Sequence, residues 1–458
     1  MNHQDEARLR IPSRFSRPWL RSDRPVPRRF VAPLESFLRT EVGSGSLLLG
    51  AALLALVWRN VAGESYVDFW HTAVSIEIGS WSFHEDLGHL VNDLLMALFF
   101  YVVALEVKRE MLFGSLRDRR TAAVPVAAAL GTMVGAAFVY LAVNLGGGGE
   151  PGGWAIPIAT DIAFAISALG IVGRRAPREL RAFMLTLAVV DDLGTIAIIA
   201  IFFSEGLEFA WLLAGAGLIA AIVIMQRIGI RQLVPYVLAA GFLWLAFYES
   251  GVHATIAGVV LGFLTPAFAF HRREATAEVI EGELREIQLD PDVDVTEATM
   301  RDVSRLAREA VSPLARMEAL LHPWSAFVVL PIFALANAGV PISIDGIGDA
   351  LSSQVGLGIV LGLVVGAPLA GIAFAWILVR TTAAELPDAL DWRAIGALAP
   401  LKGIGFTVAI FISLLAFDDP VLQEQAKLAI LIGSVLAALV GIGALLLRHR
   451  LARTEEAT

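Results

Sequence analysis

Three aspartates lie inside long apolar stretches of the sequence, where a charged side chain is unfavourable. Asp161 lies in the stretch 154–164, and the doublet Asp191-Asp192 lies in the stretch 187–195. A charge at the middle of a bilayer costs about 2.5–3.5 kcal/mol on insertion scales unless it faces water or a partner. Adjacent residues of a helix project about 100° apart. One aspartate of the doublet can therefore face a cavity while the other meets a partner.

The doublet suits a site that binds protons and cations in turn. Two carboxylates this close titrate as a coupled pair, and carboxylate oxygens are the ligands that hard cations prefer. Mutually exclusive occupancy of one wet site by the two ions is the minimum requirement for an exchanger. The structural alternative for Asp191 and for Asp192 is a helix N-cap or an ion pair between helices.

The stretch around Asp161 has the features of an interrupted helix. Asp161 follows Thr160 and lies four residues after Pro157, in a span that begins after the glycine-rich segment 146–153. Broken helices are tolerated at membrane depth only where the backbone lines a cavity. The half-helix that begins there presents the positive end of its dipole, which a carboxylate offsets.

A second interruption is predicted at 400–407, which contains Pro400, Gly403, Gly405 and a single cation, Lys402. Only three of the 35 basic residues are lysines, and an ammonium, unlike a guanidinium, can change its protonation state when buried. The alternative is a lysine that extends its ammonium to the membrane surface. Matching breaks in two halves of a chain indicate an inverted-repeat transporter with its site at mid-membrane.

Composition indicates an all-α membrane protein. The 458 residues are 57% hydrophobic and 17% charged, whereas soluble proteins are about 25% charged. The apolar runs are long enough to cross a bilayer about 30 Å thick. We expect about 12 transmembrane helices, with breaks in the fourth and eleventh: 43–58, 87–106, 122–143, 154–172, 179–203, 207–225, 233–249, 252–269, 324–340, 354–379, 395–416 and 426–447.

Loop charges support that count. Basic clusters follow every even-numbered span, whereas the loops after odd-numbered spans carry acids, so the positive-inside rule places both termini in the cytoplasm. The expected organisation is a basic, disordered cytoplasmic tail at 1–40, spans one to eight at 41–270, a charged cytoplasmic insertion at 271–322, spans nine to twelve at 323–447 and a cytoplasmic tail at 448–458.

Two local patterns add to this organisation. Apolar residues have helical spacing over 298–321, which predicts an amphipathic helix in the insertion. Between the first two spans, Val74, Ile76 and Ile78 alternate with polar residues before Gly79-Ser80. This pattern predicts a short β-hairpin over 74–83, and a plain loop is the alternative.

The composition also excludes several classes of function. The chain has no cysteine, which excludes disulfides, thiolate zinc sites, iron–sulfur clusters and cysteine nucleophiles. A net charge of -9 without a basic domain argues against binding to nucleic acid. No nucleophile motif, phosphate-binding loop or metal cluster supports an enzyme, and we expect no cofactor.

The motifs in their order resemble the NhaA-type sodium/proton antiporter family over about residues 42–445. The segments that carry the resemblance are 105–110, 114–116, 153–157, 159–164, 191–194, 250–255, 321–324, 331–339, 403–407 and 426–428. The resemblance implies a twelve-helix fold in which helices four and eleven are unwound and cross at mid-membrane. It also implies a homodimer formed through residues 74–83.

Residue roles follow from the same motifs. The resemblance implies that Asp192 is the main carboxylate for Na⁺ and H⁺, that Asp191 is its gating and proton-linked neighbour, and that Thr160 and Asp161 assist at the crossing. Further positions match those linked to pH activation, for which helix-end ion pairs are an equal alternative: Glu106, Arg109, Glu110, His253, Glu318 and His322. Histidine suits a sensor because its ordinary pKa is about 6.5.

One departure from the family concerns the charge balance of the site. The family has a lysine in helix ten, in a Gly-Lys-Pro-Leu-Gly run, whereas this chain has Gly366-Ala-Pro-Leu-Ala370, so Ala367 replaces the cation. Lys402 stands where relatives have a small neutral residue. We expect Lys402 to supply the displaced charge, because three carboxylates would otherwise have no basic partner. The ratio of protons to sodium ions then depends on Lys402.

The resulting hypothesis is a pH-regulated antiporter of a bacterial inner membrane that exchanges cytoplasmic Na⁺, or Li⁺, for external H⁺ by alternating access. One alternative is a sodium-coupled symporter for an organic solute, which would need a further polar pocket that the spans scarcely provide. The other is a pH-gated cation channel, which would conduct down the gradient without proton coupling.

Overall fold

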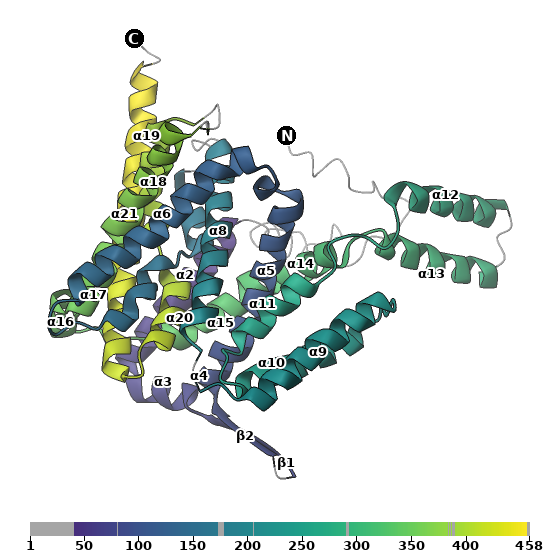
Figure 1. Ribbon diagram of the computed structural model, residues 1–458, viewed down its shortest axis with the longest axis horizontal. Coiled ribbons are helices and arrows are strands. Elements are labelled where there is room, and N and C mark those ends of the chain that lie inside the picture. Colours follow the sequence, from purple (N-terminus) through teal and green to yellow (C-terminus); the bar gives the residue numbers. More distant parts are fainter. Residues whose placement is uncertain are drawn as a thin grey trace, which may run out of the picture.

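The computed structural model describes residues 41–79, 81–172, 178–204, 206–289, 293–382, 384, 386 and 390–455. The predicted tail at 1–40 and the basic residues at 174 and 175 lie outside the described residues. The described part is helical apart from one two-stranded sheet and the connections. Its helices pack side by side in one bundle, from which two helical hairpins and the sheet project (Figure 1).

The chain contains long apolar helices in the number that a multi-pass membrane protein needs. Among the described residues, eight helices are long and apolar enough to cross a membrane, or up to ten if each of two bent pairs is one span. Their elements are α2 (Glu41–Val61), α5 (Met96–Phe113), α6 (Arg119–Asn144), α8 (Arg178–Phe202), α9 (Phe209–Arg227), α14 (Pro313–Trp324) with α15 (Leu330–Asn337), α17 (Gln354–Leu361) with α18 (Ala367–Thr381), and α21 (Pro420–Glu455). Two shorter apolar helices are α10 (Leu233–Glu249) and α11 (Thr255–Leu264).

Short helical elements complete the bundle. They are α3 (Gly63–Trp70), α4 (Leu87–Leu90), α16 (Ile344–Ser352) and a 3₁₀ turn at Ser115–Arg117. Wider π-helical turns lie at Val91–Leu95, Ser325–Val329 and Gly362–Gly366. The last two precede Pro331 and Pro368, and a proline ring displaces the carbonyl of the turn before it. A wider turn accommodates that carbonyl without ending the span.

Both predicted breaks are confirmed. The 3₁₀ segment Pro151–Ile158 meets α7 (Ile162–Val172) at a bend of 41°, and the segment formed by α19 (Trp392–Leu398) with the 3₁₀ turn Ala399–Gly403 meets α20 (Phe406–Ala416) at 46°. Both breaks coincide with the proline, glycine and polar residues noted in the sequence. In each pair the unwound residues lie near the middle of the span.

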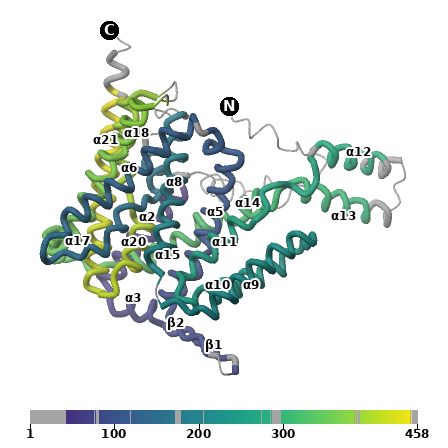
Figure 2. Tube along the Cα trace, viewed as in Figure 1, coloured from purple at the N-terminus to yellow at the C-terminus, as the bar shows by residue number. Residues whose placement is uncertain are grey.

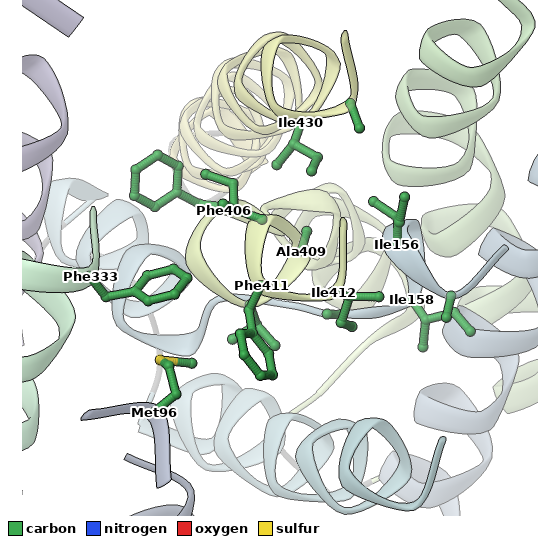
Figure 3. Close-up of a cluster of buried hydrophobic side chains, with 14 of the residues drawn as sticks. Met96, Ile156, Ile158, Phe333, Phe406, Ala409, Phe411, Ile412 and Ile430 are labelled. Carbon is green, nitrogen blue, oxygen red and sulfur yellow. The ribbon is translucent and has the colours of Figure 1, made fainter. Parts of the chain in front are cut away.

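Helix α20 lies at the centre of the hydrophobic core. Most of its residues, from Phe406 to Ser413, are buried, as expected for a helix that is apolar on every side. Its side chains contact residues from four other parts of the chain (Figure 3), namely Met96 of α5, Ile156 and Ile158 of the first broken pair, Phe333 of α15 and Ile430 of α21. The second half of the second broken pair therefore packs against several other parts of the bundle.

A β-hairpin projects from one end of the bundle (Figure 2). Strands β1 (Ala73–Ile78) and β2 (Trp81–Asp86) are antiparallel, with Val74 opposite Glu85 and Ile78 opposite Trp81. Gly79 adopts φ +65° in the turn, a conformation that glycine accepts without strain. The hairpin predicted over 74–83 is confirmed.

The charged insertion forms a second projecting hairpin, made of α12 (Arg273–Leu289) and α13 (Val293–Glu309) (Figure 1). The single amphipathic helix expected over 298–321 is instead divided, because α13 ends at Glu309 and α14 begins at Pro313. Ser312 caps α14 by accepting a hydrogen bond from the Ala315 N–H at 3.2 Å. Proline at a first helical position and a serine cap together start a new helix there.

Glu309 ties the insertion to the bundle. Its backbone carbonyl accepts hydrogen bonds from the N–H groups of Phe270 at 3.1 Å and His271 at 3.4 Å. Its carboxylate forms ion pairs with Arg231, which precedes α10, and with Arg305 at 3.3 Å, and it lies 2.9 Å from the His271 ring. Burial raises the pKa of Glu309, but the His271 hydrogen bond and the two guanidinium charges outweigh it and lower the pKa below its ordinary value.

We predict that Glu309→Gln loosens the insertion. A carboxylate with a lowered pKa contributes stability that is present at neutral pH and is lost as the pH falls through the lowered pKa. The hydrogen-exchange protection factors of the α13 amides at pH 7 should fall severalfold in the variant, and in the wild type they should fall only in acid. The matched control is Glu297→Gln on the same helix, because Glu297 is exposed and pairs only with Arg301 at 3.4 Å. Equal exchange in the Glu309 variant and the wild type would contradict the prediction.

Candidate ion-binding site

The two broken pairs meet at their unwound residues. The Asp161 N–H donates to the Ile404 carbonyl at 2.7 Å, and the Thr160 hydroxyl oxygen lies 3.0 Å from the Lys402 carbonyl oxygen. The approach is so close that a Cβ on Gly405 would lie 3.0 Å from the Ala159 carbonyl oxygen. A Cβ on Gly403 would lie 2.2 Å from the carbonyl oxygen of Leu363, in the neighbouring turn Gly362–Gly366, so only glycine fits there. The crossing thus places Thr160, Asp161 and Lys402 side by side.

Asp161 caps two half-helices at once. One carboxylate oxygen accepts from the Phe164 N–H at 3.1 Å, in the first turn of α7. The other accepts from the Thr407 N–H at 3.2 Å and from the Thr407 hydroxyl, in the first turn of α20. Both helix N-termini carry partial positive charge, and Asp161 is 3% exposed. Its negative charge therefore stabilises two like dipole ends inside the bundle.

Asp191 is enclosed by donors. Its Oδ1 accepts from the Thr132 hydroxyl at 3.3 Å, and its Oδ2 accepts from the Thr160 hydroxyl at 3.3 Å and forms an ion pair with the Lys402 ammonium. Asp191 is 1% exposed and Lys402 is 2% exposed. A buried carboxylate needs such partners to offset its lost hydration, and here a cation and two hydroxyls supply them.

Asp192 has a different environment. It lines a cavity of about 380 Å³ together with Thr160, Asp161, Thr407 and Glu106, whereas Asp191 is not part of the cavity wall. Among the described residues, no donor forms a hydrogen bond or an ion pair with the Asp192 carboxylate. The two aspartates of the doublet therefore have different surroundings, as their projection from the helix allows: Asp191 is bound to protein groups, and Asp192 faces the cavity.

Most of the residues matched to pH activation gather at one side of this cavity. Glu106 and His322 line it, and Arg109 forms an ion pair with Glu318 and lies 3.5 Å from Glu110. Glu110 in turn accepts from the N–H of Ser115, whose hydroxyl lies 2.7 Å from that of Thr186 on α8, the helix of the doublet. The cluster thus contacts the helix that carries the doublet.

His253 does not join this cluster. It lies in the connection between α10 and α11, near the Phe203 carbonyl that follows the end of α8. Thr186, which the cluster contacts, lies in the first part of the same helix. The two locations are therefore toward opposite ends of α8.

Lys402 occupies the end of a half-helix. It lies in the 3₁₀ turn Ala399–Gly403, which ends the first half of the second broken pair. The C-terminal end of a helix carries partial negative charge, which a cation offsets. Ala367, where the family has its lysine, is 3% exposed at the start of α18. Lys402 thus reaches Asp191 from the broken helix itself.

Sequence reasoning missed two hydroxyl groups. Thr407 contacts Asp161, and Thr132 contacts Asp191. Thr407 belongs to the segment 403–407 that carries the resemblance, and it had been given no role. Thr132 stands alone among apolar and glycine residues in the stretch 122–137, and an isolated hydroxyl in such a stretch was the available signal.

Together these features define a class of protein: a multi-pass membrane transporter whose buried carboxylates lie where two interrupted helices cross. The family described as "Na+/H+ antiporter 1" matches residues 35–445, and the chain belongs to that family.

Full-length relatives agree with this assignment. The chain is 42% identical to "Na(+)/H(+) antiporter NhaA" of Rhodopirellula baltica over 97% of this chain and 98% of the relative. It is 43% identical to "Na(+)/H(+) antiporter NhaA" of a Janthinobacterium species over 90% of this chain and 92% of that protein. It is also 43% identical to "Na(+)/H(+) antiporter NhaA 2" of Myxococcus xanthus, over 90% and 88% of the two chains.

Proposed function

We propose that this protein exchanges Na⁺, or Li⁺, for H⁺ across a bacterial inner membrane and that Asp192 is the carboxylate the two ions share. One observation carries the proposal: Asp192 faces the cavity without a protein partner, while the adjacent Asp191 is bound by Lys402, Thr132 and Thr160. The names and the full-length similarity of the relatives support the choice of ions.

The cavity supplies what a hard cation requires. Thr160 and the carboxylates of Asp161 and Asp192 line it, and Na⁺ binds oxygen ligands. Asp192 must lose its proton before it can take a cation, so the two ions compete for one group. Alternating access then requires the crossing to open to each face in turn. Exchange should rise with cytoplasmic pH until the supply of protons limits turnover.

Asp192→Asn and Asp191→Asn should each abolish exchange, the first by removing the shared carboxylate and the second by leaving Lys402 without its counter-ion. The assay is Na⁺-driven proton movement in proteoliposomes, with and without an imposed voltage. We expect a loss of about a hundredfold or more in each variant; for Asp191→Asn the reason is that a buried unpaired charge costs about 3–5 kcal/mol. Asp345→Asn is the control, because Asp345 is exposed in the first turn of α16.

The same assay tests competition directly. Wild-type protein should have a lower apparent KM for Na⁺ at pH 9 than at pH 6, since fewer protons compete for Asp192. Equal Na⁺ affinity at the two pH values, or full exchange in the variant that carries asparagine at both positions of the doublet, would refute the shared site.

We further propose that Lys402 provides the charge that the family places in helix ten. Its ion pair with Asp191 and its position at a half-helix C-terminus support this role. Lys402→Ala should lower the exchange rate and the melting temperature, because it leaves Asp191 buried without a cation. Lys402→Arg should restore part of the stability but not the rate, since a guanidinium is larger and does not release its proton. Wild-type rate and stability in both variants would disprove the role.

We assign pH activation to the cluster Glu106, Arg109, Glu110, Glu318 and His322, with His253 contributing from the other end of α8. The lining of the cavity by Glu106 and His322 supports the assignment. The check is the pH at which exchange begins in Glu106→Gln and His322→Gln, compared with the wild type.

We propose twelve spans: the ten that length and composition indicate, and the shorter helices α10 and α11. Spans three to five and ten to twelve would form the inverted units, with both termini and the insertion 271–322 in the cytoplasm. The broken helix in the middle of each unit supports this symmetry. Single cysteines introduced into this cysteine-free chain can be labelled from either side to check the topology.

The projecting hairpin supports a homodimer formed through residues 74–83. Strand β1 forms an edge of a two-stranded sheet, and an exposed edge pairs readily with a second chain. Replacing residues 74–83 with a short glycine–serine turn should yield monomers by light scattering in detergent, with exchange retained. Dimers of unchanged stability in that variant would contradict the hairpin interface.

A further inference from the structure

Thr132 is a buried hydroxyl on α6 to which the proposed function gives no role beyond its contact with Asp191. It is 3% exposed, and its Oγ1 lies 2.7 Å from the Ala129 carbonyl and 3.3 Å from Asp191 Oδ1. A threonine hydroxyl carries one proton, so it donates to the carbonyl of its own helix or to the carboxylate. The Ala129 contact closes a turn, whereas the Asp191 contact joins two helices.

The packing around Thr132 fixes where its hydroxyl points. Its methyl group fills the space over Gly371 of α18, where an added Cβ would lie 2.7 Å from Thr132 Cγ2. A bulkier residue at 371 would push Thr132 away from Asp191. Threonine has few χ1 rotamers on a helix, and this contact with α18 restricts them further. The hydroxyl therefore stays beside Asp191 Oδ1.

A second, smaller cavity lies on this side of the site. Its volume is about 20 Å³, and its wall includes Thr132, Gly371 and Lys402 together with apolar side chains. The cavity that Asp192 faces has none of these residues in its wall. Thr132 and Lys402 thus line a cavity other than the one that Asp192 faces, and Asp191 lies in the wall of neither.

The position of the Lys402 ammonium affects how tightly the site can bind Na⁺. An ammonium held on a short tether beside two adjacent carboxylates competes with Na⁺ for both of them. Asp191 holds Lys402 by its Oδ2, and the carboxylate keeps that orientation when a donor also satisfies its Oδ1. Thr132 is the donor that the structure places at Oδ1.

We propose that Thr132 is a positioning residue that orients Asp191 toward Lys402 and so keeps the ammonium away from Asp192. The inference rests on the proposed exchange of Na⁺ for H⁺ at Asp192. If Thr132 acts in this way, it influences Na⁺ affinity from α6 without contacting the ion.

Thr132→Val tests the inference, because valine keeps the shape of threonine and removes the hydroxyl. The apparent KM for Na⁺ in proteoliposomes at pH 8.5 should rise about threefold to tenfold, the range expected for one ordinary hydrogen bond, because the contact with Asp191 is long at 3.3 Å, while kcat changes less than twofold. Thr132→Ser should restore the wild-type KM. If the valine variant folds poorly, Thr132→Ala removes the same hydroxyl with less crowding and should raise KM in the same way.

The matched control is Thr121→Val on the same helix. The Thr121 hydroxyl also donates to the carbonyl three residues earlier, that of Asp118 at 3.2 Å, but Thr121 is exposed and remote from the doublet. Its KM should equal that of the wild type. In a Lys402→Ala background, Thr132→Val should leave KM unchanged, because the tethered competitor is gone.

The outcomes separate the two proposals. An unchanged KM in Thr132→Val and Thr132→Ala, or a raised KM that serine does not restore, would overturn the role of Thr132 while leaving the exchange function intact. Absence of Na⁺-driven proton movement in the wild type would instead overturn the proposed function.

Discussion

The fold depends on bringing two helix N-termini of like partial charge together inside a bundle. Helices α7 and α20 both begin at the crossing, and their first N–H groups have no partners within their own helices. Asp161 resolves both problems with one carboxylate, since each of its oxygens accepts from one of the two helices. Because Thr407 is buried in the first turn of α20, its N–H would be costly to leave without an acceptor.

The same crossing determines how the neighbouring acidic pair is used. Lys402 belongs to the unwound part of the second pair, so its side chain reaches Asp191 over a short path, and the Thr160 hydroxyl bridges its carbonyl to that carboxylate. Asp192 is one residue further along α8 and therefore projects to another side. Helical geometry separates the directions of two chemically identical groups, and the partners of Asp191 then give the two groups different environments.

The sequence was sufficient to predict the features that depend on local signals. Proline and glycine beside polar residues indicated both breaks, alternation before Gly79 indicated the hairpin, and the carboxylates inside apolar runs indicated the site. It was insufficient where several helices decide the outcome. Which aspartate faces the cavity depends on Thr132 and Lys402, which lie far apart in the chain. The division of the helix predicted over 298–321 depended on a serine and a proline whose capping role the apolar periodicity masked.

The hydrogen bond between Phe270 and Glu309 has a consequence for how this chain could diversify. It brings the two ends of the segment between them together, so the length of that segment does not alter the spacing of the spans on either side. Closing a longer or shorter loop between fixed ends changes the free energy of folding only slightly. Insertions, deletions or an engineered reporter domain can therefore be accommodated between Phe270 and Glu309 without a change in the packing of the membrane-spanning helices.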